Sequence, residues 1–115
     1  MAILAVWIGR LVDKFSTEED LLHAVHAQAA DSVNVIFTRH ARERMEEREI
    51  LDADVLRILQ RGDLKGRIEK EKEGNGWKLK IVYLLRGNRE AGVVTIVYSN
   101  SPELRVVTVE WEDLP

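Results

Sequence analysis

Hydrophobic positions in the first third of the chain follow the period of an α-helix. The stretch STEEDLLHAVHAQAAD begins with Ser16 and carries Glu19 three positions later, which is the pattern of a capping box. An apolar stripe of helical spacing follows at Leu21, Leu22, Val25 and Ala29. The pattern predicts a helix that begins near Ser16 and ends near Asp31.

Two less regular segments lie on either side of this helix. Residues 2–12 are apolar, and they predict either a strand or a short buried helix, because the run itself does not distinguish the two. Residues 33–38, VNVIFT, predict a short strand or an extended segment. Thr38 can then cap a second helix that runs to about Glu49.

A third helix is predicted for the stretch ILDADVLRILQRGD. Asp52 is its expected N-cap, and Gly62 marks its expected C-terminal end. Leu51 and Leu56 are spaced as a hydrophobic staple around the start of the helix. The side chains expected to face the core are Val55, Ile58 and Leu59.

Beyond Gly62 the period of the hydrophobic positions changes to two, which is typical of β-strands. The sequence GNG at residues 74–76 predicts a hairpin turn. Short connections favour an antiparallel meander. Four strands are expected, at residues 64–73, 77–85, 93–99 and 104–111. The pattern therefore predicts an α+β fold in one domain, residues 1–115, with N-terminal helices packed on a four-stranded antiparallel β-sheet.

Cysteine is absent from the chain, which excludes disulfides, thiolate zinc sites and cysteine nucleophiles. This agrees with a reducing cytoplasm. The apolar start MAILAVWIGRL lacks a basic segment and a cleavage site, and Arg10 and Asp13 interrupt it before it could span a membrane. We expect a cytoplasmic protein with no membrane partner.

The net charge of −3 hides an uneven distribution. Residues 57–89 hold ten basic and four acidic residues, whereas residues 1–56 carry a charge of −5 and residues 90–115 a charge of −4. A basic middle between acidic flanks predicts a surface that binds an anionic ligand. The alternative is that folding interleaves these charges and leaves no patch.

The most site-like stretch is FTRHARERMEERE, residues 37–49. On a helical wheel, His40, Arg44 and Arg48 follow one another at i, i+4 and i+8 beside an apolar stripe of Ala41 and Met45. This edge is either an anion-binding site or a structural clamp that fastens the helix to the sheet. We expect Arg48 to be largely buried and hydrogen-bonded, because it falls within the apolar sector.

The segments RHARERMEERE and ILDADVLRILQRGD resemble a bacterial family of small domains of unknown function. The mark of that family is a His-Ala-x-x-Arg-Met-x-x-Arg helix, a second short helix, and a sheet that ends in a Val-Val-Thr-Val strand. The matching residues are His40, Ala41, Arg44, Met45 and Arg48, with Val106, Val107, Thr108 and Val109. The resemblance covers about residues 36–111, and residues 1–30 look like a helical addition outside it.

This family is similar in layout to the RelE and BrnT toxins, in which helices pack on an antiparallel sheet. Proteins of that broader fold cleave RNA and are silenced by a partner antitoxin. The resemblance implies a RelE-like unit over residues 36–111, RNA as the substrate, and an antitoxin or other protein as the partner. Because fold alone does not fix function, two alternatives stay open: a non-catalytic protein-binding module or inhibitor, and an RNA-binding regulator. A homodimer is a further alternative.

Cleavage of RNA through its own 2′-hydroxyl needs groups that move protons, and it needs cationic side chains that stabilise the phosphorane. We expect the reaction to use no metal ion and no cofactor. His40 can move a proton near neutral pH, Arg44 can hold the phosphate, and Thr108 can supply a hydroxyl. These three are the candidate catalytic residues. The candidate substrate-binding residues are Arg48, Lys78, Arg86 and Tyr98, the last of which could stack on a base.

Two further features belong to the first 30 residues. Glu19, His23 and His26 have a spacing that a metal ion could use, but we expect ordinary surface side chains and no metal site there. We also expect residues 1–30 to bury Trp7 and the apolar stripe of the first helix against the sheet or a second copy of the chain.

Overall fold

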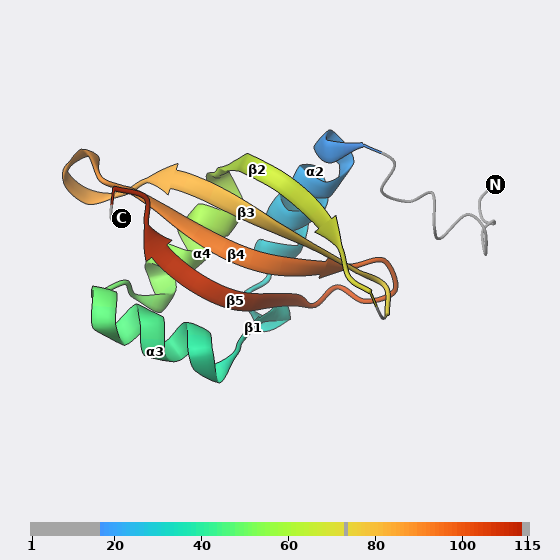
Figure 1. Cartoon of the computed structure of the whole chain (residues 1–115), viewed down its shortest axis with the longest axis horizontal. Helices are drawn as coiled ribbons and strands as arrows, with labels where there is room; N and C mark the ends of the chain where they lie inside the picture. Colours follow the sequence, from blue (N-terminus) through green and yellow to red (C-terminus); the bar gives the residue numbers. More distant parts are fainter. Residues whose placement is uncertain (1–16, 73, 114–115) are drawn as a thin grey trace.

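The computed structural model describes residues 17–72 and 74–113 (Figure 1). Its elements, in chain order, are α2 (Glu18–Ala29), η2 (Ser32–Asn34), β1 (Val35–Phe37), α3 (Arg39–Arg48), α4 (Asp52–Arg61), β2 (Asp63–Lys70), β3 (Gly76–Leu84), η3 (Arg86–Asn88), β4 (Glu90–Tyr98) and β5 (Leu104–Trp111). Within these ranges the fold is α+β, with three α-helices and a five-stranded sheet. The expectations for residues 2–12 and for Trp7 lie outside the described residues.

Strands β2 to β5 form the antiparallel meander that the sequence predicts, and the sheet order is β1-β5-β4-β3-β2. The expectation of four strands is wrong by one. Residues 35–37 form a fifth strand, β1, which pairs in parallel with β5 through Val35 and Leu104 and through Phe37 and Val106. Three residues contain too few alternations to reveal a strand, and their partner lies about 70 residues away in the chain.

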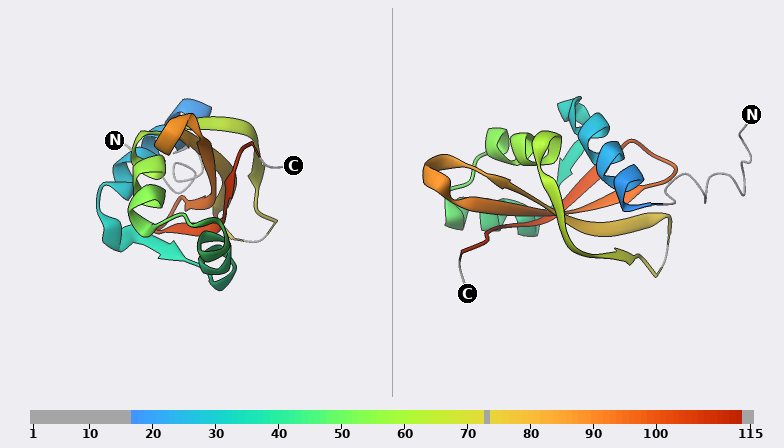
Figure 2. Two further views of the ribbon diagram at one scale, coloured as in Figure 1. Left: turned by 90° about the vertical axis from the view of Figure 1, so that its left-hand side faces the viewer. Right: turned by 90° about the horizontal axis from the view of Figure 1, so that it is seen from above.

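Helices α2 and α4 lie on one side of the sheet. Figure 2 shows α2 and α4 above the same face, and no helix of the described ranges covers the opposite face. The core between them is made by apolar side chains of both layers, including Leu21, Val25, Val55, Ile58, Leu59, Leu79, Ile81, Val93, Val97, Val106 and Val109. We call the uncovered side the open face. None of the helices in this part of the chain is long and apolar enough to cross a membrane.

Helix α3 lies beside β5 at the edge of the sheet (Figure 1) and is attached to that strand at both ends. At its start, the Thr38 hydroxyl donates to the carbonyl oxygen of Val106 at 2.9 Å and accepts from the amide of Ala41 at 3.1 Å. At its end, the indole nitrogen of Trp111 donates to the carbonyl oxygen of Arg48 at 3.0 Å. The predicted cap at Thr38 is confirmed, and the same side chain also fixes the helix to the sheet.

Replacing Thr38 by alanine is expected to lower the free energy of unfolding by about 1–2 kcal/mol, because both the helix cap and the bond to β5 are lost. Thr38→Ser keeps the hydroxyl and is the matched control, with an expected loss of less than half as much. Urea unfolding of the two variants measures the difference. Equal losses would show that the hydroxyl is not what holds α3 in place.

Two of the predicted helix starts are displaced by one residue. The N-cap of α2 is Thr17, whose side chain accepts from the amide of Asp20 at 3.0 Å. The N-cap of α4 is Leu51 rather than Asp52, because the carboxylate of Asp54 accepts the Leu51 amide at 2.9 Å. Because Leu51 is itself the N-cap and is 60% exposed, Leu51 and Leu56 do not occupy the N′ and N4 positions of a staple, and that expectation is wrong.

Candidate functional site

The edge of α3 that carries His40, Arg44 and Arg48 faces away from α4. Arg42, on the opposite side of the helix, lies over the ring of Phe37 at 4.0 Å and pairs with Asp52 of α4 at 2.6 Å. His40 is exposed and, within the described ranges, makes no hydrogen bond or ion pair. This edge is therefore open to a ligand.

The two arginines on this edge have different surroundings. Arg44 pairs with the carboxylate of Glu47 one turn further along. The side chain of Arg48 is 29% exposed, its Nη1 atom is buried, and that atom has no hydrogen-bond partner. The nearest carboxylate oxygen, of Glu47, lies 4.0 Å away. The expectation that Arg48 is buried holds only in part, and the expectation that it is hydrogen-bonded is wrong.

A groove of about 600 Å³ lies on the open face of the sheet. Strand pairing places Lys65, Lys80, Val94 and Thr108 side by side across β2, β3, β4 and β5. An extra residue in β5, Val107, interrupts the pairing with β4 next to Thr108. The residues that line the groove are Lys65, Gly66, Arg67, Glu69, Lys78, Leu79, Lys80, Val94, Val107 and Thr108.

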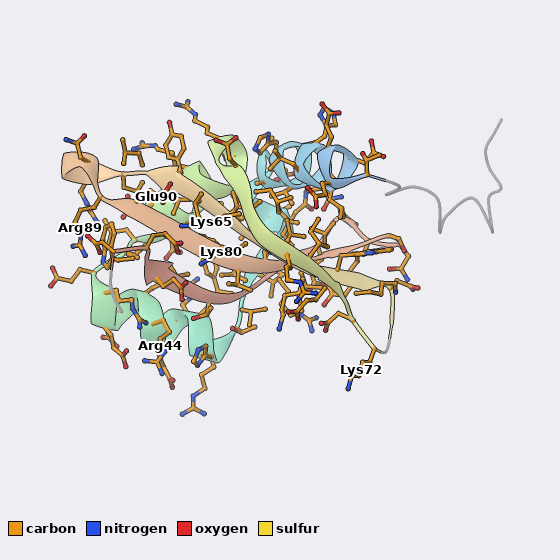
Figure 3. The ribbon with its side chains drawn as sticks, turned by 45° about the horizontal axis from the view of Figure 1, so that its top comes forward. Arg44, Lys65, Lys72, Lys80, Arg89 and Glu90 are labelled. Atoms are coloured by element: carbon orange, nitrogen blue, oxygen red, sulfur yellow. The ribbon has the colours of Figure 1, made fainter. Side chains whose placement is uncertain are left out.

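Carboxylates neutralise most of the cations in this groove. Lys80 donates to Glu110 at 3.0 Å and to Glu112 at 3.1 Å, and Lys65 donates to Glu112 at 3.0 Å. Figure 3 shows Lys65 and Lys80 close together over the sheet, with Glu90 beside them. Lys78 pairs with Glu69 at 3.7 Å, whereas Arg67 makes no hydrogen bond or ion pair in the described part of the chain.

Glu112 is the most enclosed member of this network, with a side chain that is 7% exposed. Its carboxylate lies against Gly92, where a Cβ atom would come within 2.5 Å of it. Burial alone would raise the pKa of Glu112, but hydrogen bonds from Lys65 and Lys80 and the charges of these lysines outweigh it, so the pKa is lowered. Burial lowers the pKa of Lys80, but its bonds to the two glutamates outweigh this and the pKa is raised.

Glu112→Gln is expected to remove an acid-sensitive part of the stability. Because the pKa of Glu112 is lowered on folding, its contribution is complete above the ordinary value of 4.5 and is lost as the pH falls through the lower folded value. The raised pKa of Lys80 acts only at alkaline pH. Between about pH 6 and about pH 3, the free energy of unfolding should therefore fall more in the wild type than in Glu112→Gln.

The matched control for this measurement is Glu46→Gln, which alters an exposed carboxylate on α3 that makes no ion pair in the described residues. This variant should follow the pH dependence of the wild type. If Glu112→Gln also follows it, the lysines do not stabilise the charged form of Glu112.

The structure places the predicted site residues in several groups. Thr108 and Lys78 line the groove on the open face, and Arg48 and Arg86 line a separate pocket. His40 and Arg44 line neither cavity. The ring of Tyr98 lies under the guanidinium group of Arg105, 5.7 Å from it.

One of the two histidines of α2, His26, joins this helix to α4. The Nε2 atom of His26 donates to the carbonyl oxygen of Gly62 at 2.7 Å, which joins α2 to the end of α4. Within residues 17–72 and 74–113, no three His, Asp or Glu side chains are arranged to hold a metal ion.

Sequence reasoning missed the groove residues Lys65 and Lys80 and their ion-pair partner Glu112. The alternation around Lys78 and Lys80 was a usable signal, because it places both lysines on the face opposite to Leu79 and Ile81. Which residues of the other strands lie beside them depends on the register of three strand pairs. That register cannot be obtained from the alternation of one strand.

Comparison with known proteins gives one result. A search of curated proteins and a search of solved structures found no match. The model of a protein family described as a domain of unknown function, DUF4258, matches residues 37–111. This range includes α3, α4 and the whole meander, and it agrees with the range of the resemblance noted in the sequence. The chain therefore belongs to the DUF4258 family.

Proposed function

We propose that the protein is a toxin-like endoribonuclease of the RelE and BrnT type, with a RelE-like arrangement of helices on a sheet. The observation that carries the proposal is the exposed edge of α3. There an unpaired His40 stands one helical turn from Arg44 and two turns from Arg48, beside the strand that carries Thr108. The open-face groove with its lysines supports it as a path for the RNA backbone.

The proposed reaction uses the ribose as its own nucleophile. His40 takes the proton of the 2′-hydroxyl, whose oxygen then bonds to the adjacent phosphorus atom. The bond from phosphorus to the 5′-oxygen breaks, that oxygen takes a proton from water, and His40 returns its own proton to water. The products are a 2′,3′-cyclic phosphate and a 5′-hydroxyl. Arg44 stabilises the negative charge that develops on the phosphorane, and Thr108 offers a hydroxyl to the flanking backbone.

A second candidate, a non-catalytic protein-binding module, is favoured by two observations. Lys65, Lys78 and Lys80 are all paired with carboxylates, which weakens their attraction for phosphate. In addition, Val33 and Ile36 are 74% and 46% exposed at the β1 edge of the sheet. An uncovered strand edge with apolar side chains suits a partner that adds a strand, and an antitoxin could be that partner.

The test is incubation of the purified chain, free of any protein partner, with single-stranded RNA in buffer containing EDTA. Cleavage that leaves 2′,3′-cyclic phosphate ends is the expected result, because the proposed step needs no metal ion. An inert wild-type protein that still binds RNA would favour the RNA-binding regulator. A protein that neither cleaves nor binds RNA would favour the protein-binding module. We expect the cytoplasm to be the site of action.

A further inference from the structure

A second cavity, of about 350 Å³, lies where the end of α3 meets the β3–β4 connection and the end of β5. Figure 3 shows Arg89 at this end of the sheet, where β4 begins. We call it the arginine pocket, and its lining residues are Arg48, Glu49, Arg86, Arg89 and Trp111. Three guanidinium groups from separate segments thus border one small space.

Two of these arginines, Arg86 and Arg89, are anchored through their side chains. The Arg86 Nη2 atom donates to the carbonyl oxygen of Glu49 at 3.0 Å and to the carboxylate of Asp54 at 3.2 Å. Arg89 lies over the ring of Trp111 at 4.1 Å and bonds through Nε and Nη2 to Asp113, at 3.1 Å and 3.0 Å.

The Arg48 backbone is fixed by the indole of Trp111. The side chains of Arg86 and Arg89 therefore stand in place without a ligand, which lowers the entropic cost of binding one.

The pocket has more hydrogen-bond donors than acceptors. The buried Nη1 atom of Arg48 has no hydrogen-bond partner, and no hydrogen bond of the described residues uses the Nη1 atoms of Arg86 or Arg89. A buried guanidinium nitrogen without an acceptor is costly, because it has lost its hydration without compensation.

The nearby acids do not supply the missing acceptor. Asp54 and Asp113 already accept bonds from Arg86 and Arg89, and the Glu47 carboxylate lies 4.0 Å from the Arg48 Nη1 atom, too far for a hydrogen bond. Glu49 lines the pocket and opposes an anion there, so the ligand must accept several hydrogen bonds at once to bind. A phosphate group does so, since its oxygens accept paired bonds from guanidinium groups.

We propose that the arginine pocket is a phosphate-binding site in which Arg48, Arg86 and Arg89 hold one phosphate group. The inference deepens the proposed function and rests on it only for RNA as the source of that phosphate. Phosphate binding itself requires no cleavage, so the two can fail separately. A free phosphate, a terminal phosphomonoester and a backbone phosphodiester share the required oxygens.

The experiment is a titration of the full chain with inorganic phosphate. NMR signals of the Trp111 indole N–H and of the arginine Nε–H groups are recorded at each phosphate concentration. Chloride at equal ionic strength is the reference. We expect saturable shifts at Trp111 and Arg48 with phosphate alone. Arg48→Gln should weaken phosphate binding at least about tenfold, because charge-assisted hydrogen bonds are lost.

The matched control is Arg39→Gln, which removes the same charge from α3 at a side chain that is 93% exposed and outside the pocket. It should weaken phosphate binding less than about twofold, as expected for screened surface charge. If Arg48→Gln does not fold, Arg89→Gln replaces it, with the same expected loss. Equal effects in the pocket and control variants, or no saturable shift in the wild type, would overturn the proposal.

Two competitors of the phosphate binding that NMR detects identify the source of the phosphate, a 5′-phosphorylated oligoribonucleotide and its unphosphorylated form. Competition by a 5′-phosphorylated oligoribonucleotide, but not by its unphosphorylated form, supports a site for a terminal phosphate. Competition by both supports a site for the RNA backbone. Competition by neither, with inorganic phosphate still bound, supports a site for free phosphate. In that last case RNA cleavage, if present, must use other residues, so the two proposals remain distinguishable.

Discussion

Replacing His40 by alanine is expected to slow RNA cleavage by about 10²- to 10⁴-fold, which is the usual contribution of a positioned acid or base. The affinity for RNA should change little, because His40 moves a proton and does not hold the phosphate. Arg44→Ala should weaken both binding and cleavage. The guanidinium group of Arg44 stays charged throughout the reaction, so it attracts the phosphate before and during cleavage. Single-turnover cleavage and filter binding with the same RNA separate the two effects.

The control for this prediction is His23→Ala, which removes an exposed histidine from α2 on the helical side of the sheet. It should leave cleavage unchanged. An active protein that tolerates His40→Ala would reject the proposed mechanism. A loss of activity that is equal for both histidines would indicate an effect on folding instead, which thermal unfolding of the two variants would reveal.

Gly62→Ala is expected to lower the free energy of unfolding by about 1–3 kcal/mol, the usual cost of overpacking. A Cβ atom at this position would lie 2.5 Å from the carbonyl oxygen of Val82 and 2.6 Å from that of Ile58. Both obstacles are backbone atoms, so neither can rotate away. Relief requires that the end of α4 move from the sheet, which would also disturb the bond between His26 and the Gly62 carbonyl oxygen.

Arg61→Ala is the control for Gly62→Ala, because it changes the neighbouring exposed residue at the last position of α4. Its expected effect is within about 0.5 kcal/mol. Urea unfolding at neutral pH measures both variants. If both variants lose the same small free energy of unfolding, Gly62 serves only to end the helix. The close approach to Val82 then does not require a glycine.

Local patterns were sufficient to predict most of the fold. The helices and the strands of the meander each contain several periods of hydrophobic alternation, and their short connections leave few arrangements. The sequence could not show β1, because three residues are too few for a pattern and the pairing of Val35 with Leu104 is long-range. The start of α4 was misplaced because Asp52 is a suitable N-cap, and only the fold shows that Leu51 takes that position while Asp54 accepts its amide.

The candidate site was less accessible to prediction. The wheel placed His40, Arg44 and Arg48 on one edge because all three belong to one helix, whose geometry is regular. The neighbours of Thr108 depend on strand register and on the extra residue Val107, and a shift of one residue would move them to the other face. The hydrogen-bond deficit of Arg48 depends on contacts with segments far away in the chain, which no local pattern contains.

The parallel pairing of β1 with β5 has a consequence for local unfolding. The segment from Val35 to Arg48 is bound to the sheet through one three-residue strand, the bonds of Thr38, the indole bond at Arg48 and the core packing of Ala41 and Met45. The meander keeps all its own ladders when this segment detaches, so the segment forms a separate opening unit of lower stability. Such an opening frees the edge of β5 and moves His40 away from the sheet at the same moment. A protein strand that occupies the freed edge would hold α3, and His40 with it, away from the sheet.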